Sequence, residues 1–197
     1  MVKKITIILS ITLLLFSAYT NAQTTYKVNT NSTQINWKGY KPAGKHYGTI
    51  GLKSGFFIVI NDKIVEGDFV IDMNSIVNTD LDSSSKGNAK LVNHLKSEDF
   101  FDVEKYPTAS FKITSTENKE NKILIRGDLT IKNKTNPIEF IASVKIDENQ
   151  LIFNSEIFKI DRSRWDIKYK SNSFFNNLAD KFIYDEMEIS ITIQTLK

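Results

Sequence analysis

Apolar and polar residues alternate one by one over much of the chain. Such a period of two is typical of strands in an antiparallel sheet with one dry face and one wet face. The clearest examples are the segments 69–73, 123–131, 138–146 and 187–194. Further candidate strands are the segments 34–40, 49–60, 110–115, 151–160 and 167–169.

Short polar breaks such as "NDK", "TENKENK" and "DENQ" separate these segments and suit hairpin turns. If a sheet of about eight strands, each with one apolar face, stayed open, a large hydrophobic surface would be exposed to water. Closing the sheet removes that surface and the unpaired edges. The pattern therefore predicts an all-β fold, a single extended antiparallel barrel of about eight strands, with a two-sheet sandwich as the competing arrangement.

One segment interrupts the alternation. After the polar stretch "TDLDSSSKGNAK", Asn88 is a candidate cap for a short helix over residues 88–97. Leu91 and Leu95 form a narrow apolar stripe on it. We expect this helix to lie over the barrel, with Phe100 and Phe101 as a plug at its exit.

The chain begins with features of a secretory signal peptide. Lys3 and Lys4 precede the apolar run 5–16, and Thr20-Asn21-Ala22 offers small side chains for cleavage. We expect residues 1–22 to be removed near Ala22, leaving a single domain of residues 23–197 in the periplasm or another exported location. No later apolar run has the length of a membrane span.

Composition narrows the possible chemistry. Removing Lys3 and Lys4 lowers the formal charge from +3 to about +1, so nucleic acid is not an expected partner. The absence of cysteine excludes thiol catalysis, thiolate metal sites and disulfides.

Neither catalysis nor metal binding has a supporting motif. His46 and His94 are far apart and lack the spacing of metal ligands, and no Gly-x-Ser-x-Gly elbow is present. His94 with nearby acids is the remaining candidate for a metal or hydrolytic site, although an i,i+4 pair with Glu98 is more typical of a surface interaction. We predict no metal and no enzyme activity.

A barrel of about eight strands is just wide enough to hold a ligand beside its own side chains. The apolar positions predict a lining made of Trp37, Phe69, Ile71, Met73, Leu91, Leu95, Phe111, Ile125, Leu129, Phe140, Phe153, Met187, Ile189 and Ile191. Weaker polar candidates, for a head group or for a structural role, are His94, Asp99, Arg162 and Tyr169. Arg162 could pair with a carboxylate or cap carbonyls at strand ends.

Several motifs resemble those of the YceI-like family of exported proteins. They are "GDFVIDMNSI", "HLKSEDFFDVEKYPTASF", "GDLTIKNKT" and "FKIDRSRWDIKY", with "GKHYGTI" ahead of them. The resemblance implies a lipocalin-like barrel that encloses a long polyisoprenoid or another amphiphilic lipid, a periplasmic location and, in some members, a homodimer. Asp166 departs from the pattern, because the family often has glycine there. The segment Ile35-Asn36-Trp37 replaces the Gly-x-Trp of true lipocalins, which indicates a similar shape rather than membership.

The leading hypothesis is non-catalytic binding or carriage of a long apolar isoprenoid or other amphiphilic lipid, with no cofactor apart from such a lipid. A second hypothesis is a stress-related interaction or scaffold protein with a fully packed barrel. A third is a weak hydrolase that depends on His94.

Overall fold

The computed structural model describes residues 23–196, so the predicted signal segment lies outside the described residues. The strands are β1 (Gln23–Val28), β2 (Gln34–Lys41), β3 (Gly44–Ile60), β4 (Lys63–Asn78), β5 (Thr108–Lys119), β6 (Lys122–Ile131), β7 (Lys134–Ile146), β8 (Leu151–Ser155), β9 (Phe158–Asp161) and β10 (Glu186–Leu196). The helix α1 (Lys86–Lys96) and two short 3-10 helices, η1 (Arg162–Trp165) and η2 (Ala179–Lys181), complete the fold.

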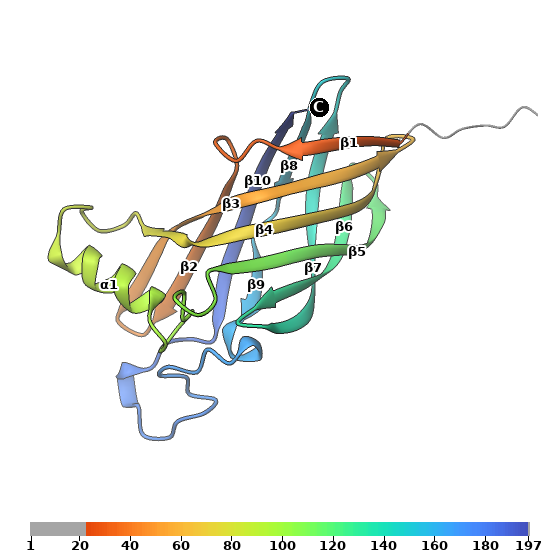
Figure 1. Cartoon of the computed structure of the whole chain (residues 1–197). Helices are drawn as coiled ribbons and strands as arrows, with labels where there is room; N and C mark the ends of the chain where they lie inside the picture. Colours follow the sequence, from red (N-terminus) through yellow and green to blue (C-terminus); the bar gives the residue numbers. More distant parts are fainter. Residues whose placement is uncertain (1–22, 197) are drawn as a thin grey trace, which may run out of the picture.

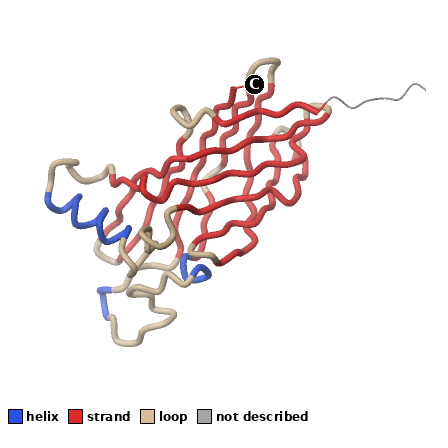
Figure 2. Tube along the Cα trace, viewed as in Figure 1, coloured by secondary structure: helices blue, strands red, loops and turns tan. Residues whose placement is uncertain are grey.

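The sheet closes on itself. From β2 to β8 each strand pairs antiparallel with the next, and β10 pairs with both β2 and β8 (Figures 1 and 2). These eight strands make a ring, while β9 extends the line of β8 along β10 and β1 pairs with β3 and β10. The prediction of an all-β, antiparallel, eight-stranded barrel is confirmed.

Irregular pairing gives the longest strands their curvature. The ladder between β3 and β4 shifts register between Thr49 and Gly51, between Leu52 and Ser54, and between Ile58 and Val59. A bulge of this kind bends the strand and increases its twist. Strands of 17 and 16 residues can therefore wrap around the core instead of running flat.

Two strand predictions need correction. The segment 151–160 is not one strand, since β8 and β9 are separated at Glu156 and Ile157. The segment 167–169 is not a strand at all, because the carbonyl of Ile167 accepts a hydrogen bond from Nη1 of Arg162 at 2.6 Å and the chain turns there. Asp166, just before it, has φ 65° and ψ 26°, the left-handed conformation that favours glycine.

The helix starts two residues earlier than predicted. Ser85, not Asn88, is the N-cap, and its Oγ accepts a hydrogen bond from the backbone N–H of Asn88 at 3.1 Å. The Asn88 side chain is buried and instead donates to the carbonyls of Asn78 and Leu81 at 3.2 and 3.0 Å. Asn88 thus ties α1 to the end of β4, which positions the helix.

The two ends of the barrel differ. The β3–β4, β5–β6 and β7–β8 hairpins meet at one end, which we call the closed end, and α1, η1, η2 and the β2–β3 hairpin gather at the other, which we call the mouth (Figure 1). Buried side chains at the closed end are Tyr26, Val59, Ile64, Ile123 and Leu151. None of the helices within residues 23–196 combines the length and the apolar character needed to cross a bilayer.

Candidate functional site

The barrel encloses a cavity of about 190 Å³. Its wall is built from side chains of all eight ring strands, together with α1 and the segment that follows it. Native interiors leave few voids larger than a water molecule, so a space of this size is a built cavity rather than a packing defect. All fourteen residues predicted to line the interior lie in this wall. Their role as ligand contacts stays a prediction.

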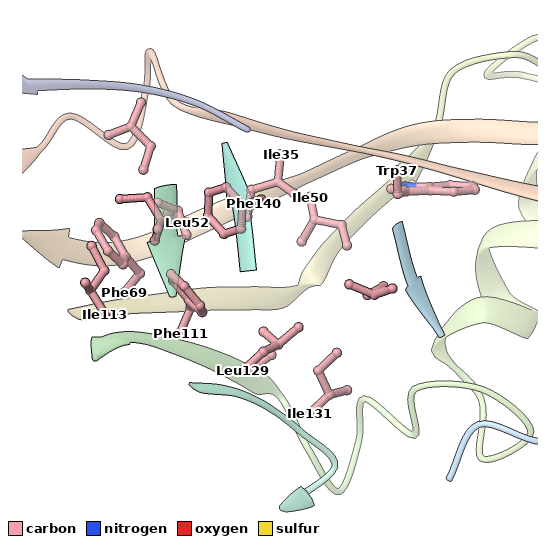
Figure 3. Close-up of a cluster of buried hydrophobic side chains, with 14 of the residues drawn as sticks. Ile35, Trp37, Ile50, Leu52, Phe69, Phe111, Ile113, Leu129, Ile131 and Phe140 are labelled. Carbon is pink, nitrogen blue, oxygen red and sulfur yellow. The ribbon is translucent and has the colours of Figure 1, made fainter. Parts of the chain in front are cut away.

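The cavity is elongated along the barrel. On β10 its wall runs from Met187 to Ile193, six residues apart, which corresponds to about 20 Å of strand. Figure 3 shows Trp37 at one end of the buried cluster and Phe69 and Ile113 toward the other. The space therefore suits a long, narrow apolar molecule better than a round one.

Five phenylalanines from five strands form a closed set of ring contacts, which we call the phenylalanine collar. Neighbouring ring centroids lie 4.9 to 6.4 Å apart, a separation typical of favourable aromatic pairs. In order around the barrel, the collar consists of Phe57, Phe69, Phe111, Phe140 and Phe153. All five also line the cavity. Because the packed residues of the closed end lie beyond it, the collar forms the floor.

Side chains from α1 and the following turns cover the mouth. Leu91, Leu95, Phe100 and Phe101 all line the cavity. The rings of Phe100 and Phe101 are only 7% and 6% exposed, and the backbone N–H of Phe101 donates to the carbonyl of Leu95 at 3.1 Å. These two rings are buried where the sequence analysis expected a plug.

Arg162 also lines the cavity, and most of its guanidinium contacts are with the protein. It is 1% exposed and donates to the carbonyls of Ile167, Ile183 and Tyr184. Its Nη2 also lies 3.1 Å from Oδ1 of Asp185. Burial lowers the pKa of Arg162, while Asp185 opposes the shift by favouring the charged form. Arg162 therefore holds the connection before β10 against the barrel, and most of its donors are used by the protein itself.

The other three polar candidates lie outside the cavity wall. Nε2 of His94 is 3.1 Å from Oδ2 of Asp99, and the His94 ring packs edge-on against Phe100 and Tyr169. His94 therefore supports the Phe100 ring on the side that faces away from the cavity. Within residues 23–196, no three His, Asp or Glu side chains gather in a way that could hold a metal ion.

The structure adds a polar residue that the sequence analysis did not select. His46, on β3, lines the mouth of the cavity beside Gly39 and Lys41 of β2. Its Nδ1 lies 2.9 Å from Oδ2 of Asp80. The partner is 34 residues away in the sequence, so no local spacing could have indicated the pair.

The closed antiparallel ring and its narrow apolar interior define a lipocalin-like barrel protein. The chain matches the model of the YceI-like domain over residues 26–195, and it belongs to this family.

Curated relatives match over part of their length. A UPF0312 protein of Vibrio cholerae is 40% identical over 73 residues, which cover 34% of this chain and 39% of that protein. A UPF0312 protein of Photorhabdus laumondii is 29% identical over 109 residues, half of each chain. The chain thus spans between two fifths and half of the length of these relatives.

Solved structures share the fold over nearly all of the described chain. BcnA of Burkholderia cenocepacia has a TM-score of 0.65 at 18% identity, covering 85% of this chain and 98% of its own. A polyisoprenoid binding domain from Saccharophagus degradans, implicated in plant cell wall breakdown, has a TM-score of 0.61 at 12% identity, covering 87% and 97%. At these identities the likeness shows a common fold.

Proposed function

We propose that this protein binds a long apolar isoprenoid, or another amphiphilic lipid with a single long chain, inside the barrel without chemically changing it. The observation that carries the proposal is the elongated cavity, whose wall is apolar from the phenylalanine collar to the mouth. The similarity in fold to a polyisoprenoid binding domain supports it.

The driving force would be removal of ligand surface from water, worth about 25 cal/mol per Å² of apolar area. Part of this gain is offset by the ordering of a flexible chain on binding. Because the inner wall has almost no polar group to fix a register, chain length and girth would govern affinity more than exact chemical structure along the chain.

The cavity also argues against the two alternative functions, a scaffold with a packed barrel and a hydrolase that depends on His94. A scaffold with a fully packed barrel would have no space of about 190 Å³ inside. A hydrolase based on His94 would need that residue to face a bound substrate, whereas His94 lies outside the cavity wall. Binding is therefore the function that this geometry supports best.

The first experiment identifies the cargo. Protein purified without detergent is extracted with organic solvent, and the extract is analysed by mass spectrometry. The expected result is a long-chain lipid in the extract and saturable binding of geranylgeraniol by the delipidated protein. A protein that yields no lipid and binds no prenyl chain would contradict the proposal.

A matched pair of variants tests where the ligand lies. A side chain added at Gly39 meets no atom within 4 Å and enters the mouth of the cavity, so Gly39→Leu should obstruct the cavity without straining the fold. Lys38→Leu adds the same side chain one residue earlier, on the outer face of β2. We expect Gly39→Leu to weaken geranylgeraniol binding at least tenfold, whereas Lys38→Leu binds as the natural protein does. Equal binding by both variants would place the ligand elsewhere.

We also propose that the protein works outside the cytoplasm, on the basis of the signal-like segment 1–22. Fractionation of the source cells followed by N-terminal sequencing should give an exported form that begins at Gln23. A cytoplasmic protein that keeps Met1 or Val2 would contradict export and leave the binding proposal intact.

A further inference from the structure

The mouth contains an open space beside an imidazole. Gly39 and His46 are directly opposite each other in the β2–β3 ladder, on the inward face that also carries Trp37 and Ile50. Opposed residues in an antiparallel pair have their Cβ positions about 5 Å apart. Since nothing lies within 4 Å of the position that a Cβ of Gly39 would take, the space next to the His46 ring is free.

One nitrogen of His46 is committed to a carboxylate. Oδ2 of Asp80 lies 2.9 Å from Nδ1, while Oδ1 accepts hydrogen bonds from the backbone N–H of Tyr47 at 2.8 Å and from the side-chain amide of Asn78. Burial opposes ionisation of Asp80, but these donors outweigh it and hold the pKa of the carboxyl below its ordinary value.

The Asp80 carboxylate fixes the tautomer of the ring. An ionised carboxylate only accepts hydrogen bonds, so Nδ1 of His46 must carry the proton. In the neutral imidazole, Nε2 is then an acceptor. No hydrogen bond joins Nε2 to any other residue in the described part of the chain.

We propose that the ligand carries a hydroxyl head group, which donates its hydrogen bond to Nε2 of His46 in the space beside Gly39. The inference rests on the proposed function and adds the chemical class of the cargo, a long-chain alcohol. Lys41, an exposed residue that lines the same part of the mouth, would supply a donor for the hydroxyl oxygen. A hydroxyl is the small group that uses both, because it donates one hydrogen bond and accepts others.

The other cation of the mouth, Arg162, is mostly committed to the protein itself. The guanidinium of Arg162 already donates to three carbonyls and faces Asp185. The free acceptor on the β2–β3 side of the mouth therefore favours recognition of the head group there. Asp80 acts as a positioning residue, since it orients the imidazole and does not reach the ligand itself.

The test compares two ligands that differ only in whether the terminal oxygen carries a hydrogen or a methyl group. Geranylgeraniol and its methyl ether have the same chain, but only the alcohol can donate to Nε2. The natural protein should bind the alcohol about threefold to tenfold more tightly, the ratio expected from one neutral hydrogen bond. His46→Leu should abolish this preference and leave the affinity for the ether unchanged or slightly higher.

The second histidine provides the matched control. His94 also faces a carboxylate but lies outside the cavity wall, so His94→Leu should keep the preference for the alcohol. Asp80→Asn, which frees the tautomer and keeps the imidazole, should reduce the ratio. A natural protein that binds both ligands equally, or a His46→Leu variant that keeps the preference, would overturn the inference while leaving the proposed function standing. Failure of the natural protein to bind either ligand would instead contradict the proposed function.

Because the chain has only two histidines, the tautomer can be observed directly by ¹⁵N NMR of the ring nitrogens. The His94→Leu variant leaves a single imidazole to assign. Its spectrum should show a protonated Nδ1 and an unprotonated Nε2 in the free protein, and Nε2 should shift when geranylgeraniol binds. An Nε2-protonated ring would overturn the inference.

Discussion

The closed end and the mouth of the barrel are built from the same strands, yet only one of them is filled. At the closed end, hairpins such as Asn61-Asp62 turn tightly, and both of these residues have positive φ. The buried side chains there pack against one another beyond the phenylalanine collar. At the mouth, the β2–β3 and β6–β7 hairpins are also tight, but the other two connections, residues 79–107 and 162–185, are long.

This difference shows how the two ends of a barrel made of successive antiparallel strands can take different structural roles. Alternate hairpins of an antiparallel barrel lie at opposite ends, so one end can be short and rigid while the other receives the insertions. Loops held on a rigid scaffold commonly carry function. Here the insertions supply α1, the plug rings of Phe100 and Phe101, and Arg162. We call the hydrogen bonds from Arg162 to the carbonyls of residues 167, 183 and 184 the Arg162 clamp. The closed end instead supplies the floor of the cavity.

Removing the Arg162 clamp should have the largest effect. Arg162→Ala leaves three carbonyls without their donor and Asp185 without its counter-charge, so we expect a loss of about 3–5 kcal/mol in the free energy of unfolding. Urea denaturation followed by tryptophan fluorescence would measure it. Lys159→Ala, which removes an exposed ion pair with Glu186, is the control and should leave the transition nearly unchanged. Similar midpoints for both variants would show that Arg162 does not hold the mouth.

Opening the floor should change both stability and ligand choice. Phe57 is 1% exposed, so Phe57→Ala should cost about 3–5 kcal/mol. The lost ring deepens the cavity, and longer prenyl chains should gain affinity relative to geranylgeraniol. Leu151→Ala, a buried change outside the cavity wall, should destabilise the protein without altering the preferred chain length. An unchanged length preference in Phe57→Ala would mean that the collar is not the floor.

Loosening the plug should cost somewhat less. Phe100→Ala removes a buried ring that contacts His94, Tyr169 and the guanidinium of Arg162, and we expect a loss of about 3 kcal/mol because one side of the ring already faces the cavity. Dissociation of geranylgeraniol, followed by stopped-flow fluorescence, should be faster. A variant with unaltered dissociation would show that Phe100 is a core residue and not a plug.

The smallest effect is a stabilisation at the mouth. Asp166 has the left-handed conformation that glycine adopts without a Cβ penalty. Asp166→Gly should therefore raise the free energy of unfolding by at most about 1 kcal/mol, even though it removes exposed contacts with Lys134 and Lys168. A clear destabilisation, measured by the same urea titration, would show that those contacts outweigh the backbone strain.

The alternation of residues predicted most of the barrel, because strands with one buried face leave a period of two in the sequence. The prediction was wrong where a contact with a distant residue, and not the local alternation, determines the backbone conformation. Ile167 and Tyr169 alternate like strand residues, but the Arg162 side chain takes the carbonyl of Ile167 and fixes a turn. The strand β1 was not predicted, since only Tyr26 is fully buried in it.

The cavity wall was predictable for the same reason as the strands, whereas the polar side of the mouth was not. His46 becomes a candidate only when the ladder sets it opposite Gly39 and the end of β4 brings Asp80 to its ring. Conversely, Arg162 and His94 looked available for a ligand in the sequence. Partners that lie up to 23 residues away hold one nitrogen of His94 and most of the donors of Arg162.

The ring closes through β10, which follows every other strand in chain order and pairs with both β2 and β8. During synthesis, a chain that still lacks β10 has two unpaired edges and no enclosed interior. Contacts so distant in sequence also form slowly. A chain shortened before β10 would therefore expose its apolar faces and strand edges to aggregation, and it would lack the closed interior in which the proposed ligand binds.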